Sequence, residues 1–373
     1  MKDKIGTIIM SIIIILILAV FGVFGIIMWE EIKAMQVTVE PENFKTTVSE
    51  NTNTTQEIET PNIKTSALED IKDNPNITQN VDYSNVNVDK YFYNQLENES
   101  KIIYKAFESN KENMKSGTYK IELGDSFSNL LNTANGQDEL GDYYQSAIES
   151  YTYDNPDVFY LSPNKMYLNI ETTTRGSKTT YYVYIDNGDK SNYLIDEFSS
   201  KQEVESAISQ IESVKNQLVS KKTGDTYNDI KLVHDYLVDN VEYDTSISKP
   251  NIYNTYGALI NHVAVCEGYA RSFKYIMDNM GIPCVLVIGK GTNSKGETEN
   301  HAWNYIELNG AWYAIDTTWD DPVVTGGGTA SQKSRYKYFL KGSNTFNQDH
   351  TPSGNFTPNG KTFTYPQLNV QDN

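Results

Sequence analysis

The fold of this chain is decided by the stretch VCEGYARSFKYIMDNMGIPCVLVIG at residues 265–289. Apolar and aromatic residues recur from Cys266 to Met280 with the 3.6-residue period of a helix, and Gly281 supplies the stop. A short apolar run then predicts a buried strand over 285–289. The stretch therefore predicts a helix followed by a strand, with a cysteine in the first helical turn.

A second stretch, NHAWNYIELNGAWYAIDTTWDD at residues 300–321, predicts a β-hairpin. Asn309-Gly310 lies between alternating residues and is the dipeptide that a two-residue type I′ turn prefers. Such a turn pairs Leu308 with Ala311 and fixes the register of both strands. A helix, a strand and a hairpin in this order predict an α+β domain.

The register of this hairpin brings two chemically useful side chains together. When this register is extended away from the turn, His301 lies opposite Thr318 and Trp303 lies opposite Asp316. Because side chains alternate along a strand, the four share one face, and His301 and Asp316 become diagonal neighbours with Cβ atoms on the order of 7 Å apart. The alternative is a hairpin whose polar residues only face solvent.

Cys266 begins the predicted helix, where unpaired N–H groups and partial positive charge stabilise a thiolate. The same N–H groups can hydrogen-bond a developing oxyanion, and Gly268 is expected to leave space for a substrate backbone. Two observations point the other way. Cysteine is among the most buried residue types, and the neighbouring Glu267 opposes a thiolate. From these residues alone, a nucleophile and a core residue are equal alternatives.

Cys266, His301 and Asp316 are the residue types of a thiol nucleophile, a general base and the carboxylate that orients it. A zinc site built from the same three lacks a fourth ligand and short ligand spacing, so neither a metal nor a cofactor is expected. His234, inside a helix predicted over 227–241, is expected to be structural. Cys284 is expected to be a free buried thiol, because a helix of about 15 residues, roughly 22 Å long, separates it from Cys266.

Both stretches resemble the core of the transglutaminase-like superfamily, whose papain-like cysteine-enzyme fold packs the cysteine-bearing helix on an antiparallel sheet. The likeness covers roughly 227–340 and includes the order of cysteine helix, strand and His-Ala-Trp-Asn. It implies that Cys266 is the nucleophile, His301 the general base and acid, and Asp316 the orienting carboxylate. The preceding region is similar to extracellular members from Gram-positive bacteria.

The sequence departs from the animal cross-linking enzymes of this superfamily. Those enzymes follow the cysteine with Trp and use a further upstream Trp to hold the oxyanion, whereas no Trp lies between Trp29 and Trp303 here. Their calcium-binding regions have no recognisable counterpart either. Tyr256 and Trp303 are therefore candidates for an oxyanion or substrate contact, with packing as the main alternative for Tyr256.

The amino-terminal part of the chain predicts a membrane anchor. Ile5–Trp29 is a run of 25 residues without a charge, long enough for a helix that crosses a bilayer. Two lysines precede it and two glutamates follow it, so residues 1–4 should form a cytoplasmic tip and the later residues should be extracellular. A cleaved signal peptide is the alternative. Residues 30–85 are rich in Thr, Asn and Glu and predict a disordered stalk.

The rest of the chain divides into three predicted parts. They are an ancillary α+β region over 86–222, a catalytic domain over 223–345 and a turn-rich tail over 346–373. In the ancillary region we expect helices near 93–111, 140–153 and 201–221, and a strand pair over 165–172 and 178–185. His350, at the start of the tail, is expected to brace a turn.

Composition narrows the class of function. The 49 Asp and Glu outnumber the 31 Lys and Arg, giving a net charge of −18 that argues against a nucleic-acid partner. The sequence predicts a single-pass, membrane-anchored extracellular thiol enzyme that cleaves a protein or peptide amide at the cell surface or wall. The alternatives are a transferase that cross-links surface proteins and a surface-binding module without catalysis. Neither the substrate nor the oligomeric state is predicted.

Overall fold

The structure, a computed structural model, describes residues 63–67, 81–293, 296–321, 334–354 and 361–373. Within these ranges, no helix has both the length and the apolar character that crossing a bilayer requires. The membrane span predicted over 5–29 lies outside them, as does most of the stalk predicted over 30–85.

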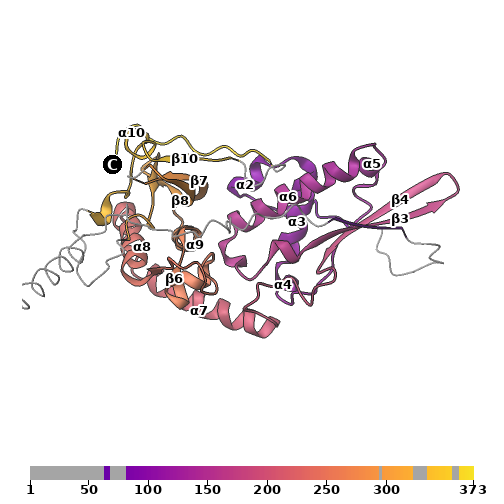
Figure 1. The fold of residues 1–373 in the computed structure, drawn as a ribbon, viewed down its shortest axis with the longest axis horizontal. Helices are drawn as coiled ribbons and strands as arrows, with labels where there is room; N and C mark the ends of the chain where they lie inside the picture. The colour runs from indigo at the N-terminus through magenta and orange to yellow at the C-terminus, as the bar shows by residue number, and fades with distance from the viewer. Residues whose placement is uncertain (1–62, 68–80, 294–295, 322–333, 355–360) are drawn as a thin grey trace, which may run out of the picture.

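Figure 1 shows the described elements arranged as a carboxyl-terminal half beside an ancillary half. The helices are α2 (Tyr91–Gln95), α3 (Asn98–Ser109), α4 (Lys111–Met114), α5 (Ser128–Leu131), α6 (Gly136–Asp154), α7 (Lys201–Val219), α8 (Thr226–Asn240), α9 (Cys266–Met280) and α10 (Ser343–Phe346). Short 3-10 turns cover Pro156–Val158, Pro163–Lys165 and Ser334–Tyr336, and a π-helical turn covers Gly257–Asn261. The strands are β1 (Ile63–Ala67), β2 (Ile121–Gly124), β3 (Tyr167–Arg175), β4 (Lys178–Asp186), β5 (Glu242–Tyr243), β6 (Val263–Ala264), β7 (Cys284–Thr292), β8 (Thr298–Leu308), β9 (Ala311–Ile315) and β10 (His350–Pro352).

In the carboxyl-terminal half, α9 packs on an antiparallel sheet of order β10-β7-β8-β9. Phe273, Ile276 and Met277 form the fully buried face of α9, and Val285 and Leu286 of β7 belong to the same core. The helical period and the apolar strand therefore bury one common surface. The predicted α+β class, with the cysteine-bearing helix on an antiparallel sheet, is confirmed.

Local signals fix the ends of the elements as predicted. Gly281 adopts φ +71°, and the Ile282 N–H donates to the Met277 carbonyl, as expected where glycine ends a helix. The Asp225 side chain accepts the Asn228 N–H and caps α8. Asn309 and Gly310 have φ values of +54° and +80°, so the predicted type I′ turn is present.

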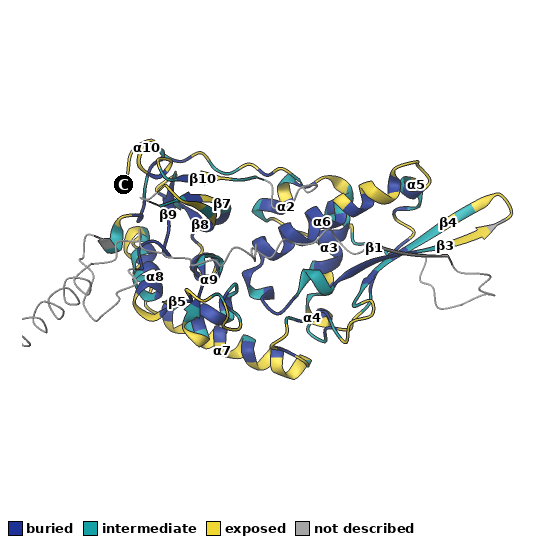
Figure 2. Ribbon diagram, in the orientation of Figure 1, coloured by how far each residue is buried: buried dark blue, intermediate teal, exposed yellow. Residues whose placement is uncertain are grey.

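In the ancillary half, α3 and α6 pack together beside a sheet of order β1-β3-β4-β2. Figure 2 shows that the carboxyl-terminal part of α6, from Tyr144 to Asp154, is buried, while its first turns and the tip of the β3–β4 hairpin are largely exposed. The helix predicted near 93–111 divides into α2, α3 and α4. The Asp154 carboxylate explains the separate start of α2, because it accepts the N–H groups of Phe92 and Tyr93.

Two segments that were predicted to lack strands, the stalk and the tail, each contain one. Within the predicted stalk, Ile63–Ala67 form β1 and pair in parallel with β3. Within the predicted tail, His350–Pro352 form β10 and extend the sheet beside β7, so the domain boundary at 345 excludes a strand of that sheet. Both strands lie at an edge and are held by backbone hydrogen bonds, which leave little trace in side-chain composition.

Candidate active site

Cys266 is the first residue of α9, as predicted, and its thiol is free and half-buried. The chain reaches it through β6, where Ala264 pairs with Tyr243 of β5. Val265 precedes the helix in an extended conformation and its N–H donates to the Ile252 carbonyl at 2.9 Å. The thiol is therefore placed at an amino end that is fixed by a short parallel ladder and by the loop 252–254.

The β8–β9 hairpin has the predicted register, with Leu308 opposite Ala311, but its pairing ends at Asn304 and Ile315. The predicted pairs of His301 with Thr318 and of Trp303 with Asp316 do not form, because Asp316 leaves the strand and donates its N–H to the Tyr338 carbonyl instead.

The two predicted polar side chains nevertheless meet. The His301 ring donates from Nε2 to Asp316 Oδ2 at 2.6 Å, and both residues are buried. The departure of Asp316 from β9 thus leaves its carboxylate within reach of the strand that carries His301.

His301 also interacts with Cys266. Burial lowers the pKa of His301, but the charge and hydrogen bond of Asp316, followed by the hydrogen bond and charge of Cys266, raise that pKa well above its ordinary value. Because Nε2 faces Asp316, Nδ1 is the ring nitrogen left for the thiol. The environment therefore favours an imidazolium between a carboxylate and a sulfur atom.

The Asp316 carboxylate is held at both oxygens. Oδ1 accepts the N–H groups of Thr318 and Trp319 at 2.9 and 3.0 Å, and Oδ2 accepts His301 and, at 3.1 Å, His350. Burial raises the pKa of Asp316, yet the charge and hydrogen bond of His301, followed by the hydrogen bond and charge of His350, outweigh it and hold the pKa well below its ordinary value. Asp316 is therefore a fixed carboxylate.

The placement of His350 corrects a prediction. It does not brace a turn of the tail, because it is the first residue of β10 and lies buried against Asp316. Nothing in the local sequence signals this contact, since 34 residues separate the two. One oxygen or nitrogen atom from each of His301, Asp316 and His350 lies within 4.8 Å of the others, as in a metal site. Their mutual hydrogen bonds account for that proximity, and we assign no metal to them.

Three further residues lie near Cys266 or His301 and were not predicted. Burial raises the pKa of Tyr243 and Tyr253, and in both cases the charge of Cys266 is the next largest cause. Glu299 faces His301, and burial raises the pKa of its carboxyl. Strand alternation through His301 was a usable signal for Glu299, because the two are two residues apart on β8.

Gly268 has a different role from the predicted one. A Cβ atom there would lie 2.4 Å from the Ile252 carbonyl oxygen and 2.8 Å from the Ala264 Cβ. The space that glycine leaves is therefore filled by the protein's own loop 252–254 rather than held open for a substrate. Glu267, expected to oppose a thiolate, is paired with Arg271 at 2.7 Å.

Tyr256 and Trp303, the predicted oxyanion or substrate contacts, pack against other rings in the structure. The Tyr256 ring stacks on Phe159 with a centroid separation of 5.9 Å, and its hydroxyl faces Gln210. Trp303 is buried, with its ring 5.0 Å from that of His350. For Tyr256, these contacts favour the alternative of a packing role.

The remaining predicted side chains behave as structural groups. His234 is buried and bonds Asp235 and Asp320 at 3.0 and 3.1 Å, which ties α8 to the segment after β9. Cys284 is a free buried thiol, as predicted, and burial raises its pKa. Cys284 is thus a natural internal control for the reactivity of Cys266.

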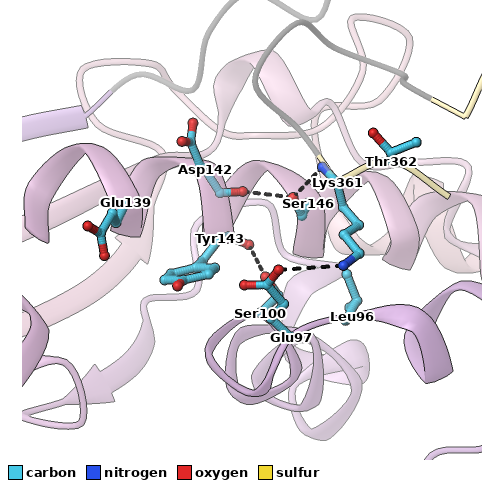
Figure 3. A pocket seen from close by; sticks show the side chains of 9 residues that line it. All are labelled: Leu96, Glu97, Ser100, Glu139, Asp142, Tyr143, Ser146, Lys361 and Thr362. Carbon is cyan, nitrogen blue, oxygen red and sulfur yellow. Dashed lines mark hydrogen bonds and ion pairs between the residues drawn. The ribbon is translucent and has the colours of Figure 1, made fainter. Parts of the chain in front are cut away.

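An open polar cavity of about 420 Å³ lies in the ancillary half, and Figure 3 shows its lining. Carboxylates of Glu97, Glu139 and Asp142 face it from α6 and the start of α3, and Lys361 pairs with Glu97 across it at 3.5 Å. None of its lining residues belongs to the Cys266 site.

Comparison with known proteins identifies part of the chain. Residues 212–317 match the family model of the transglutaminase-like superfamily, and this part of the chain is a transglutaminase-like domain. Kyphoscoliosis peptidase of Mus musculus is 28% identical over 160 residues, which are 38% of this chain and 24% of the relative. The Homo sapiens protein of the same name is 26% identical over 155 residues, or 37% of this chain and 23% of the relative. The chain therefore spans about a quarter of the length of these relatives.

A crystal structure of a TGase aligns with a TM-score of 0.29 and 18% identity, covering 47% of this chain and 50% of the other.

Proposed function

We propose that this chain is a thiol enzyme of the transglutaminase-like type that cleaves a protein or peptide amide through a thioester on Cys266. The observation that carries the proposal is the His301–Asp316 hydrogen bond at 2.6 Å, beside a Cys266 thiol that starts a helix and contributes to the raised pKa of His301. A carboxylate, an imidazole and a thiol in this order are the parts that acyl transfer needs.

The proposed reaction has two halves. The Cys266 thiolate attacks the amide carbonyl carbon, and the resulting oxyanion collapses as the C–N bond breaks and the His301 imidazolium gives its proton to the departing amine. The acyl group then remains on sulfur as a thioester. Neutral His301 takes a proton from water, the hydroxyl oxygen attacks the thioester carbonyl, and the C–S bond breaks to release the acid and restore the thiolate–imidazolium pair.

The N–H groups at the start of α9 are the proposed donors to the oxyanion, because they are unpaired within the helix and adjoin the sulfur atom. Asp316 holds the His301 ring by Nε2, which leaves Nδ1 to exchange the proton with the reacting atoms in this scheme. In this scheme Asp316 never exchanges a proton with substrate.

Hydrolysis is the first choice of reaction, since both curated relatives carry the name peptidase. Transfer to an amine is a second candidate, because the Glu299 carboxylate faces His301 and would attract a cationic acceptor. We further propose, from the uncharged run Ile5–Trp29 alone, that the chain is anchored in a membrane with its catalytic part outside the cell and acts on surface or wall proteins.

The test is to incubate the purified full-length chain with a panel of proteins and a biotin-tagged primary amine, with Cys266→Ala as the inactive control and Cys284→Ala as the matched control. Peptide fragments that require Cys266 support hydrolysis, and tag incorporation that requires Cys266 supports transfer. If neither appears and Cys266 forms no thioester with any substrate, a binding module without catalysis replaces the proposal.

A further inference from the structure

His350 lies behind the proposed active site and has no part in the mechanism above. Its Nε2 lies 3.1 Å from Asp316 Oδ2, the same oxygen that accepts His301 at 2.6 Å. The side chain is fully buried, and the two imidazole rings are 5.6 Å apart. One carboxylate oxygen is therefore shared by two histidines from different strands.

The second nitrogen of His350 also faces a carboxylate. Nδ1 lies 2.7 Å from Asp349 Oδ1, and Asp349 Oδ2 accepts the Tyr338 hydroxyl at 2.8 Å. A carboxylate only accepts hydrogen bonds, so each of the two contacts needs a proton on the His350 ring. This is the arrangement of an imidazolium held between two carboxylates.

Aromatic rings enclose the His350 ring and fix its orientation. Phe346 stacks on it with a centroid separation of 3.9 Å, and Trp319 lies at 4.5 Å. The faces of such rings attract a cation. On the backbone, His350 pairs with Gly291, where a Cβ atom would lie 2.8 Å from the Trp319 ring. Residues of both β10 and β7 therefore shape the space around the His350 ring.

We propose that His350 is a positioning residue of the active site, a buried cation that aims Asp316 at His301 and offsets part of its negative charge. The inference rests on the proposed function of Cys266. The titratable groups that face His350 are Asp349 on its own segment, Asp316 after β9, His301 on β8 and Tyr338 before α10.

The two parts of this role have separate consequences. A neutral replacement leaves the Asp316 charge less compensated, so the pKa of His301 should rise further. A replacement without a donor also frees Asp316 Oδ2 from one of its two anchors, so the His301 ring should be held less firmly.

The test compares His350→Gln, which retains a neutral donor, with His350→Phe, which retains only the ring. In full-length protein with labelled histidine, NMR follows the titration of the His301 ring, while iodoacetamide alkylation follows Cys266 across the same pH range. We expect His350→Gln to raise the His301 midpoint by about 0.5–1 pH unit. We expect His350→Phe to lower kcat by roughly tenfold to a hundredfold at similar KM, with partial recovery in His350→Gln.

An unchanged His301 midpoint in folded His350→Gln overturns the proposal, as does equal kcat in all three proteins.

Should His350→Phe fail to fold, Asp349→Asn supplies the second arm, because loss of that carboxylate should also shift the His301 midpoint. The NMR titration does not depend on catalysis. A wild-type protein that never acylates Cys266 refutes the proposed function, whereas an unchanged midpoint refutes only the role of His350.

Discussion

Asp316 is the residue on which the proposed active site converges, because two histidines and two backbone N–H groups bind its carboxylate. Asp316→Asn keeps the size of the side chain but removes its charge. The charge is a principal cause of the raised pKa of His301, so its loss should lower that pKa and move the alkaline limb of the pH–rate profile to lower pH. We expect kcat/KM to fall by about 10²–10⁴, measured on any substrate found for the wild type.

Asp320→Asn is the matched control for this variant. Asp320 is equally buried and bonds His234, but it does not contact the His301 ring. It should alter stability with little change in the pH–rate profile. Equal losses of activity in both variants would mean that Asp316 acts only through folding.

At the scale of single residues, the sequence predicted the features that depend on a local sequence pattern. The helical period placed Cys266 at a helix start, and the Asn-Gly turn set the register of β8 and β9 as far as Asn304 and Ile315. His301 and Asp316 meet beyond that paired region, where Asp316 has left the strand. The sequence did not predict His350, because its contact with Asp316 depends on how a later segment folds back. The role of Gly268 was misread for the same reason, since the atoms that fill its space belong to the loop 252–254.

At the scale of elements, the start of α9 depends on close contact with the loop 252–254. In Gly268→Ala, the new Cβ would clash with the Ile252 carbonyl oxygen at 2.4 Å and push the loop and the first helical turn apart. We expect about 1–3 kcal/mol of destabilisation and a loss of Cys266 reactivity larger than the loss of stability explains. Chemical denaturation and alkylation rates provide the two measurements.

Gly176→Ala is a useful comparison, since nothing lies within 4 Å of that position and only its φ of +61° opposes a side chain. It should cost about 1 kcal/mol and leave Cys266 reactivity unchanged. If Gly268→Ala behaves in the same way, the loop does not fix the helix start.

Elements whose side chains show a strong period were predicted well. The helices α7, α8 and α9 and the hairpins β3–β4 and β8–β9 lie where the sequence placed them. The edge strands β1 and β10 were not predicted, because each joins an existing strand through its backbone. Their pairing depends on an exposed edge that forms only when the rest of the sheet has folded.

At the scale of the whole molecule, residues 361–373 connect the two halves. Phe363 packs against Phe92 of α2, whereas Leu368 and Asn369 lie beside Trp312 of β9. Figure 1 shows the carboxyl-terminal segment running from the neighbourhood of α2 to that of α10, where the chain ends. Since Phe363 and Leu368 are buried, deletion of 361–373 should remove several kcal/mol of stability.

Calorimetry of this deletion should show a lower Tm and separate transitions for the two halves. A single transition at the wild-type Tm would show that the segment contributes nothing to their association.

The pH dependence of stability should reflect Asp321. Its Oδ2 lies 2.5 Å from the Tyr269 hydroxyl, which also bonds the Val241 carbonyl at 3.0 Å. Burial raises the pKa of Asp321 to about 7, above its unfolded value. The folded state therefore binds the extra proton, and stability should fall as pH rises from about 4 to about 7, by at most on the order of 4 kcal/mol.

Asp321→Asn cannot ionise and should flatten this part of the stability curve, measured by urea denaturation between pH 4 and 8. The same slope in wild type and variant would exclude Asp321 as its source.

The most direct test of the account is the pH dependence of Cys266 alkylation by iodoacetamide, read peptide by peptide by mass spectrometry in the native full-length chain. A thiolate paired with the His301 imidazolium should react rapidly near pH 6, where an ordinary thiol is almost fully protonated. Cys284, buried with a raised pKa, should stay unlabelled. His301→Gln should abolish the fast reaction at that pH. A Cys266 rate that rises only above about pH 8, unchanged in His301→Gln, would contradict the central claim.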